Sequence, residues 1–534
     1  MPEILTAEQA IRNYIPNGAS VAFGGFVGAM HAEEITSTME RLFLEIGSPN
    51  NLTIVYAAGQ GDSKDRGLNH LGHPGMTGRI IGGHWGLAPK LGELAANNEA
   101  AAYNIPQGVI SQMFREIAAN RPGVITHVGL HTFVDPRLEG GMLNQKAREA
   151  GELVEVVHID GEEMLFYHKF PLNVAILRAT YADLKGNCTF QREGVQAETL
   201  AIAQAVKNQG GTVIVQVEDI VEYGNLDTRL VRLPGIYVDV LVKGSMENHG
   251  QTFGTYYNPS YSGEVRVPLE ALEPMPLNVR KVIARRAAME LMPNAITNLG
   301  IGMPEGVASV AAEEGLEGMV LTTEAGTIGG IPASGKDFGV TTNPDCILDQ
   351  PAQFDFYDGG GLDIAFLGLA QMDREGNVNV SKFGPKIPGC GGFINITQNA
   401  KKVVYCGTFT MGGLKAEIAD GSLHILQEGR GKKLLQQVEQ ITFSGAYARK
   451  VEQPVLYITE RAVFELTEAG VELVEIAPGV DLEKDVLRQM EFTPIIRNVR
   501  LMDSRIFRDE PMGLAVCSSK HTIEDDTEQC RCSA

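Results

Sequence analysis

The sequence predicts an α/β fold made of two structurally related halves with mostly parallel central sheets. Its 534 residues are too many for one hydrophobic core, so two or more domains are expected. Short runs rich in Val and Ile, such as 213–217 and 403–406, alternate with helical segments. This alternation is typical of buried parallel strands joined by helices. In addition, two stretches of the first half are echoed in the second.

The first echo concerns the order of elements at the start of each half. We predict a helix over 7–15, a break at Pro16-Asn17-Gly18, a strand over 20–23, a turn at Gly24-Gly25 and a helix over 32–43. The same order follows later as a helix over 285–292, Pro293-Asn294, a strand over 296–299, Gly300-Ile301-Gly302 and a helix from Glu305. A repeated order of this kind indicates an internal duplication.

The second echo is a strand followed by an acidic turn. Leu172-Asn-Val-Ala-Ile-Leu precedes Asp183-Leu-Lys-Gly186-Asn187, and Leu362-Asp-Ile-Ala-Phe-Leu precedes Asp373-Arg-Glu-Gly376-Asn377. The Gly-Asn pairs are turn signals. Residues 252–280 between the halves are rich in Tyr, Pro, Gly and Glu, as expected of a linker. We therefore predict an N-terminal half at 1–255, a linker at 256–280, a C-terminal half at 281–517 and a disordered tail at 518–534.

One carboxylate stands out at the end of a predicted strand. The stretch from Leu321 to Gly330 reads Leu-Thr-Thr-Glu-Ala-Gly-Thr-Ile-Gly-Gly and places Glu324 directly before three glycines. Strand ends are where rigid sheets present side chains to ligands. Glycine permits a positive φ and a close backbone approach. The parallel stretch in the first half, 52–59, has Ala57 in place of the acid, which favours a functional carboxylate over a structural one.

Composition and charge exclude several classes of function. The formal net charge of -21 argues against nucleic acid or an anionic membrane as a partner. The N-terminus lacks a signal-peptide pattern and no run of about 18 apolar residues occurs, so we expect a cytoplasmic protein. Five of the seven cysteines are scattered, which suits reduced thiols. The Cys530-Arg-Cys532 pair lacks a second ligand pair, and no metal site is predicted.

Two glycine clusters and one amide are candidates for binding or catalysis. Gly300-Ile-Gly302-Met-Pro304 offers backbone amides to an anion before a helix. Gly389-Cys-Gly391-Gly392 follows Lys382 and Lys386, and lysines beside backbone donors suit a phosphate or an oxyanion, although a plain surface turn fits equally well. Gln107, in the turn Pro106-Gln107-Gly108, is either a donor to an oxyanion or a turn residue.

The aromatic and imidazole side chains give no clear functional pattern. The histidines at 70, 73, 84, 127, 131 and 158 have no metal-ligand spacing, so we interpret most of them as structural. The only tryptophan, Trp85, is interpreted as a packing residue.

Together these motifs resemble the class I coenzyme A transferases. The resemblance runs from about Leu5 to Met512 and rests on the Gly24-Gly25-Phe26 turn, the Pro106-Gln107-Gly108 turn, Glu324-Ala-Gly326, Gly391-Gly392 and the ending Val474-Glu-Ile-Ala-Pro-Gly479. The chain is most similar to single-chain acetate or propionate CoA-transferases, whose fused halves correspond to the α and β subunits of other members. Two motifs depart from the family pattern: the common Ser-Glu-Asn-Gly is Thr323-Glu-Ala-Gly here, and Gly-Gly-Phe is followed by Val27-Gly-Ala-Met-His31.

The resemblance implies a ping-pong transfer of CoA between a short-chain acyl-CoA and a free carboxylate such as acetate, propionate or butyrate. It implies that Glu324 is the nucleophile and that the reaction passes through an acyl-glutamyl anhydride and a glutamyl-CoA thioester. The active site is then expected between the halves. Gln107 and the amide of Gly392 would bind the oxyanions. The CoA tail is expected near Gly300, Gly302, Lys386 and Gly391. CoA is a substrate, no prosthetic group is implied, and a homodimer or homotetramer is expected.

Three other functions are compatible with these residues. Water in place of the carboxylate would make the protein an acyl-CoA hydrolase on the same scaffold. A CoA-binding protein without catalysis would not need Glu324, Gln107 and both glycine clusters together. A sugar-phosphate isomerase would use Glu324 as a base, but it would need a basic phosphate site beyond Lys386.

Overall fold

The computed structural model describes residues 1–268, 274–316 and 318–514; the predicted tail at 518–534 and the Cys530-Cys532 pair lie outside the described residues. By its internal contacts the chain forms two compact units. The first contains Met1–Val267, Thr322–Gly359 and Val380–Asn399, and the second contains Pro268–Leu321, Gly360–Asn379 and the chain from Ala400 onward. Each unit is described below by itself.

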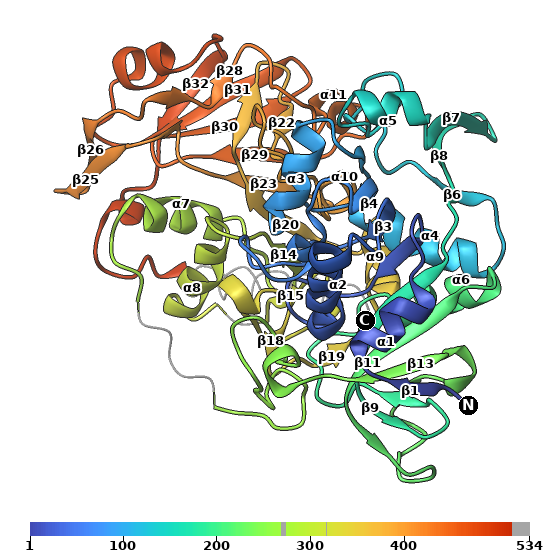
Figure 1. Cartoon of the computed structure of the whole chain (residues 1–534). Coiled ribbons are helices and arrows are strands. Elements are labelled where there is room, and N and C mark those ends of the chain that lie inside the picture. The colour runs from blue at the N-terminus through green and yellow to red at the C-terminus, as the bar shows by residue number, and fades with distance from the viewer. Residues whose placement is uncertain (269–273, 317, 515–534) are drawn as a thin grey trace, which may run out of the picture. The chain divides into compact units, whose positions relative to one another are not determined.

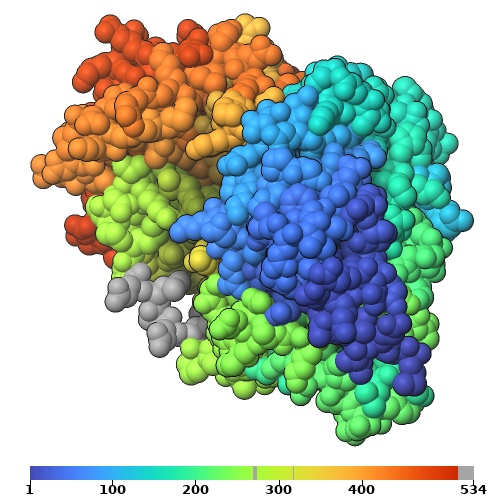
Figure 2. Space-filling view, in the orientation of Figure 1, coloured from blue at the N-terminus to red at the C-terminus, as the bar shows by residue number. Residues whose placement is uncertain are grey.

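The first unit is built on a large, mostly parallel sheet. Its main strand order is β1-β13-β11-β9-β2-β3-β4-β5, and every neighbouring pair along this order is parallel. The strands are β1 (Glu3–Leu5), β2 (Ser20–Phe23), β3 (Leu52–Tyr56), β4 (Thr77–Gly82), β5 (Ala101–Asn104), β9 (Val174–Asp183), β11 (Thr212–Val221) and β13 (Val240–Lys243). In Figure 2 the blue N-terminal residues adjoin green ones, in agreement with the pairing of β1 with β13.

Helices cover both faces of this sheet. On one face, α1 (Ala7–Tyr14), α2 (Glu33–Ile46) and α3 (Pro89–Ala96) share a core cluster with strand residues such as Ile176. On the other face, α6 (Thr199–Asn208) contacts β9 and β11, and its Ile202 lies with Leu177 beside Gly24. Adjacent residues of a strand point to opposite faces, which explains why Ile176 and Leu177 lie in different cores. Figure 1 shows α1 and α2 in blue against one another.

The remaining elements of the first unit are η1 (Leu68–Leu71), α4 (Gln107–Ala118), β6 (Gly123–Thr126), α5 (Gln145–Ala150), β7 (Val154–Ile159), β8 (Glu162–His168), β10 (Cys188–Thr189), β12 (Val231–Leu233), η2 (Gly235–Tyr237), η3 (Met246–Asn248), β16 (Thr327–Ile328), β17 (Ile331–Pro332), η4 (Gly335–Asp337), β18 (Thr341–Thr342), β19 (Cys346–Ile347), α9 (Gln350–Asp358) and α10 (Phe393–Asn399). Among them, β10 and β12 add to this sheet beside β9, and β16 pairs with β19.

The second unit contains a second sheet, in which β14, β20, β23 and β29 are parallel and β30 and β31 are antiparallel. These strands are β14 (Ile296–Leu299), β20 (Ile364–Gly368), β23 (Val403–Cys406), β29 (Val455–Ile458), β30 (Ala462–Thr467), β31 (Gly470–Ile476) and β32 (Ile495–Leu501). The other elements are α7 (Val279–Ala288), α8 (Glu305–Glu313), β21 (Gln371–Asp373), β22 (Val378–Asn379), β24 (Thr410–Met411), β25 (Lys415–Ala419), β26 (Ser422–Gln427), β27 (Gly431–Lys432), β28 (Leu434–Leu435), α11 (Gly445–Lys450), η5 (Leu482–Val486), η6 (Leu487–Gln489) and η7 (Ser504–Phe507). The predicted α/β class with mostly parallel sheets is confirmed.

The repeated acidic turn is the same structure in both places. Asp183 accepts hydrogen bonds from the backbone of Lys185 and Asn187, and Asp373 accepts them from Glu375 and Asn377.

Both turns are also fixed from outside in the same way. The side chain of Asn187 accepts from the N–H of Gly235 at 3.0 Å, and that of Asn377 accepts from the N–H of Gly445 at 2.9 Å. The match includes a distant glycine in each case, so the echo in the sequence reflects a shared local structure.

One predicted boundary is wrong. The helix expected over 285–292 is α7, which begins at Val279 and ends at Ala288. Asn278 caps it, because its side chain accepts from the N–H groups of Arg280 and Lys281. Asn278 lies inside the stretch whose composition predicts a linker, so the start of α7 could not be recognised from composition.

Candidate active site

Glu324 lies at the apex of a tight turn. β15 (Val320–Thr322) leads into the turn and β16 leads out of it. The carbonyl of Thr323 accepts from Gly326 N–H at 3.1 Å, and Thr323 N–H donates to Thr327 at 3.0 Å. Gly326 has a φ of 105°, and a Cβ there would lie 2.2 Å from the carbonyl oxygen of Leu348. Gly326 is therefore required because the Leu348 backbone leaves no room for a side chain. The half-buried Glu324 is held on a short, constrained loop.

Buried hydroxyl groups anchor this turn. The Oγ1 atoms of Thr323 and Thr327 lie 2.7 Å apart, and those of Thr327 and Thr341 also lie 2.7 Å apart. All three threonines are buried. On the strand before the turn, Tyr357 of α9 donates its hydroxyl to Thr322 at 2.8 Å. Glu324 therefore follows two residues that are fixed through their side chains.

Gln107 is brought against the second glycine cluster. It is the first residue of α4, after Pro106, and its backbone N–H donates to the carbonyl of Gly391 at 3.0 Å. Gly391 in turn donates its N–H to Gly83 at 2.9 Å. The side chain of Gln107 is buried, yet its Nε2 has no hydrogen-bond partner among the described residues. An unpaired buried amide is unusual and calls for an explanation.

Gly392 lies next to this contact and packs on α9. A Cβ on Gly392 would lie 3.2 Å from Cζ of Phe354, and one on Gly108 would lie 2.6 Å from Cδ1 of the same ring. The backbone N–H of Gly392 has no partner in the described part of the chain. Phe354 and Tyr357 lie one turn apart on α9, so this helix contacts Gly108 and Gly392 through Phe354 and the strand before the Glu324 turn through Tyr357.

The other predicted binding residues are found elsewhere. Lys386 is exposed on a tight turn, where its backbone pairs with Phe383. Gly300 and Gly302 belong to the second unit. There the N–H of Gly300 continues the sheet by donating to Phe366, and the carbonyl of Gly302 accepts from Arg280. The structure thus joins Gln107 to Gly391 by a hydrogen bond, with Gly392 next in the chain, whereas the proposed CoA contacts remain predictions.

His84 was interpreted from sequence as structural, but its surroundings are unusual. A Cβ on Gly59 would lie 2.4 Å from its Nδ1, one on Gly86 would lie 3.2 Å from its Cε1, and one on Gly391 would lie 3.6 Å from its Cδ2. Its Nδ1 is buried and has no partner among the described residues. Burial lowers the pKa of His84 to about 4. The run Gly82-Gly-His-Trp-Gly86, in which glycines flank a histidine, is the signal that points to this site. Trp85 is fully buried, as expected of a packing residue.

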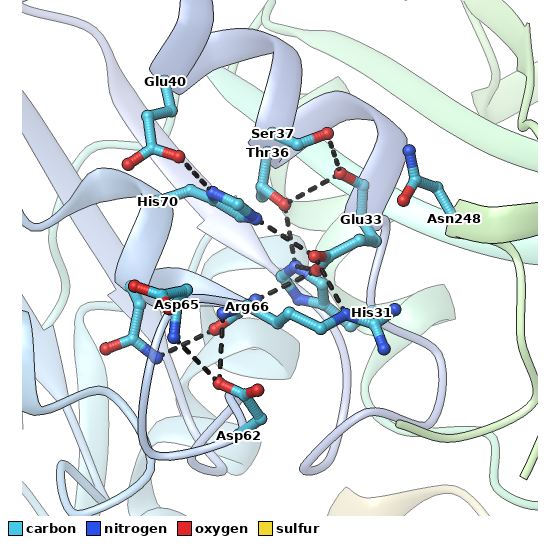
Figure 3. A network of polar contacts seen from close by, with 12 residues as sticks. His31, Glu33, Thr36, Ser37, Glu40, Asp62, Asp65, Arg66, His70 and Asn248 are labelled. Atoms are coloured by element: carbon cyan, nitrogen blue, oxygen red, sulfur yellow. Dashed lines mark hydrogen bonds and ion pairs between the residues drawn. The ribbon is translucent and has the colours of Figure 1, made fainter. Parts of the chain in front are cut away.

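A separate polar network lies at the start of α2 (Figure 3). His70 lies between two carboxylates, with Nε2 3.0 Å from Glu33 and Nδ1 2.5 Å from Glu40. Glu33 also contacts Arg66 at 3.2 Å and His31 at 3.5 Å. Among the residues that the structure describes, no group of His, Cys, Asp and Glu is arranged to hold a metal ion.

Comparison with known proteins identifies the family. Residues 4–244 match the family model described as Coenzyme A transferase. The chain is 47% identical over 528 residues to caffeate CoA-transferase of Acetobacterium woodii, covering 97% of this chain and 100% of that protein. It is 43% identical over 522 residues to acetate CoA-transferase YdiF of Escherichia coli O157:H7, covering 97% of each.

Solved structures agree with this assignment. The crystal structure of the acyl-CoA transferase YdiF apoenzyme from Escherichia coli O157:H7 superimposes with a TM-score of 0.91 at 43% identity and covers 96% of this chain and 97% of that one. A thioester complex of the same protein with CoA matches with a TM-score of 0.90. No helix within the described ranges is long and apolar enough to cross a bilayer. The chain belongs to the coenzyme A transferase family and is an enzyme of the single-chain CoA-transferase type.

Proposed function

We propose that this enzyme moves CoA from a short-chain acyl-CoA to a free carboxylate, such as acetate, propionate or butyrate, with Glu324 as the covalent nucleophile. The observation that carries the proposal is the position of Glu324 on a turn fixed by three buried threonines, in the same unit as the unpaired amide of Gln107. The acetate CoA-transferase and the caffeate CoA-transferase among its relatives support a carboxylate acceptor.

The chemistry needs a covalent relay because a carboxylate is a weaker nucleophile and a better leaving group than a thiolate, so direct exchange of an acyl-CoA with a free carboxylate is uphill. A carboxylate oxygen of Glu324 attacks the acyl carbonyl carbon, the C–S bond breaks and CoA leaves as the thiolate, which gives a mixed anhydride. The thiolate then attacks the Glu324 carbonyl carbon, the C–O bond breaks and the donor acid leaves as its carboxylate. The acceptor carboxylate repeats these steps in reverse order, so no net proton or electron is consumed.

Each attack places negative charge on a carbonyl oxygen, and the unpaired donors suit that oxygen. The Nε2 of Gln107 and the backbone N–H of Gly392 both lack partners among the described residues. Donors that are fixed in place before the reaction stabilise an oxyanion without further reorganisation. We propose these two groups as the oxyanion site.

Binding of CoA and assembly are further parts of the proposal. Gly300, Gly302, Lys386 and Gly391 remain our candidates for CoA contacts. Residues 1–255 and 281–517 are proposed as the two homologous halves, supported by the equivalent turns at Asp183 and Asp373. A homodimer or homotetramer is proposed on the general preference of enzymes for closed symmetric assemblies, and light scattering on the purified protein measures it.

Steady-state kinetics distinguish transfer from hydrolysis. With propionyl-CoA as donor, we expect acetyl-CoA to appear only when acetate is added, and double-reciprocal plots at several acetate concentrations to be parallel. Glu324→Gln should abolish this activity. Glu116→Gln, the same change on an exposed pair with Arg121, should leave it intact. Release of free CoA at an equal rate without acetate would show a hydrolase instead.

A further inference from the structure

His84 has the features of a side chain kept free for a ligand. Its ring lies among Gly59, Gly86 and Gly391, and a Cβ on any of the three would come within 3.6 Å of it. Gly59 and Gly391 are buried, and Gly86 is exposed. The half-buried imidazole is therefore enclosed on two sides and open near Gly86.

The two ring nitrogens have different surroundings. Nδ1 faces Gly59 and is buried without a partner, whereas Nε2 is not among the buried unpaired atoms and so keeps access to the open side. The ring is neutral near pH 7 because burial lowers its pKa to about 4. A neutral imidazole has one N–H, and placing it on Nδ1 would bury an unpaired donor. The proton is therefore assigned to Nε2.

One edge of the His84 ring lies near Gln107. The position of a Cβ on Gly391 is 3.5 Å from Oε1 of Gln107 and 3.6 Å from Cδ2 of His84, the ring atom bonded to Nε2. Oε1 of Gln107 and Cδ2 of His84 thus border one small space beside Gly391, and the two N–H groups belong to the same amide and the same ring. An unpaired buried nitrogen is unusual for a packing residue, and with the proton on Nε2 the Nδ1 atom stays a buried acceptor.

We propose that His84 is a further substrate-binding residue, whose Nε2–H donates to the carbonyl oxygen of the thioester or anhydride alongside the Gln107 amide. The proposal rests on the transfer mechanism described above. It assigns the glycines at 59, 86 and 391 a common purpose, since they leave room for the ring and for a carbonyl next to it.

Two amide substitutions test which nitrogen acts. In His84→Gln the side-chain amide nitrogen reaches about the place of Nε2, whereas in His84→Asn it reaches about the place of Nδ1. The rate of CoA attachment to Glu324 after mixing with propionyl-CoA is measured by rapid quench and intact mass. We expect His84→Asn to be slower than the wild type by about 10- to 100-fold and His84→Gln to retain most of the rate.

Binding of a thioether analogue distinguishes a role in substrate binding from a structural role. S-propyl-CoA lacks the carbonyl oxygen, so its Kd should be the same for the wild type and both variants. Equal rates for all three proteins would overturn the proposal. So would equal losses in both variants together with weaker S-propyl-CoA binding, because that pattern indicates a structural role. If the wild type itself forms no adduct on Glu324, the transfer mechanism fails and the role of His84 fails with it.

Discussion

The backbone N–H of Gln107 donates to the carbonyl of Gly391 at 3.0 Å, which joins the start of α4 to the glycine cluster before α10. This bond fixes the Gln107 backbone while its side-chain Nε2 stays unpaired. A donor that is positioned by its main chain and unused by its side chain suits an oxyanion that exists only during turnover.

Replacing Gln107 by Ala should reduce activity much more than stability. Loss of one such donor is expected to lower kcat/KM by about 100- to 1,000-fold, while the melting temperature changes little because the amide nitrogen has no partner to lose. Kinetics and thermal unfolding measure the two effects.

Asn104→Ala is the matched control for Gln107→Ala. The Asn104 amide is fully buried, donates to the carbonyl of Gly82 and accepts from Cys390 N–H, both at 2.9 Å. Its loss should cost about 1–3 kcal/mol of stability for each group left unpaired. If Gln107→Ala destabilises the protein as much as Asn104→Ala while its kcat/KM stays normal, Gln107 is structural.

Thr327→Val should disturb the Glu324 turn by removing both hydroxyl contacts of Thr327. Two buried hydroxyls then lose a partner, so we expect a loss of about 1–3 kcal/mol in unfolding free energy. We also expect kcat to fall about 10-fold at unchanged KM, because the proposed nucleophile Glu324 is less well positioned. Thr327→Ser keeps the hydroxyl and should behave like the wild type; equal effects of Ser and Val would show that the methyl group matters instead.

Gly326→Ala should damage both stability and activity. A Cβ there meets the Leu348 carbonyl oxygen at 2.2 Å, and φ is 105°. Gly151 has a similar φ of 101° and nothing within 4 Å of its Cβ position. Gly151→Ala therefore reports the conformational strain alone, about 1–3 kcal/mol. Chemical denaturation of both variants should show a larger loss for Gly326→Ala, and equal losses would contradict the close approach.

The ion pairs of His70 should stabilise the folded protein only within a limited pH range (Figure 3). Burial lowers the pKa of His70, but its hydrogen bonds with Glu33 and Glu40 outweigh this and raise it above 6.5. Burial opposes the charge of Glu33, yet His70, His31 and the Gly67 N–H bring its pKa down to about 2. The histidine contribution is complete below pH 6.5 and is lost as pH rises through the raised value. The glutamate contribution is complete above pH 4.5 and is lost as pH falls toward 2.

His70→Asn should therefore lower stability most between about pH 4.5 and 6.5, by about 1–3 kcal/mol. The difference from the wild type should shrink at pH 9 and at pH 3. Urea unfolding at these pH values measures it. A difference that does not change with pH would show that the charges of His70, Glu33, Glu40 and their neighbours His73, His31 and Arg66 do not matter.

Much of the architecture could be predicted because it depends on local patterns. The strand over 20–23 and the acidic turns at Asp183 and Asp373 are specified by neighbouring residues, and each has the predicted form. The Glu324 turn was also predictable, since glycine tolerates the φ that Gly326 adopts.

What could not be predicted depends on contacts between distant segments. The bond from Gln107 to Gly391 and the hydroxyl contact of Thr327 with Thr341 exist only after folding. The surroundings of His84 cannot be predicted from sequence because two of the three glycines beside its ring, Gly59 and Gly391, are distant from it in the chain. Unpaired buried atoms cannot be seen in a sequence, although they mark this site most clearly.

The most direct test of the account is to locate the covalent intermediate. The enzyme is mixed with propionyl-CoA without acceptor, its intact mass is measured, and peptides are mapped after borohydride or hydroxylamine treatment. The mechanism predicts a CoA adduct in the intact mass, a reduced side chain or a hydroxamate at Glu324 in the mapped peptide, and neither change in Glu324→Gln. Consumption of propionyl-CoA with no adduct, and at an unchanged rate in Glu324→Gln, would contradict it.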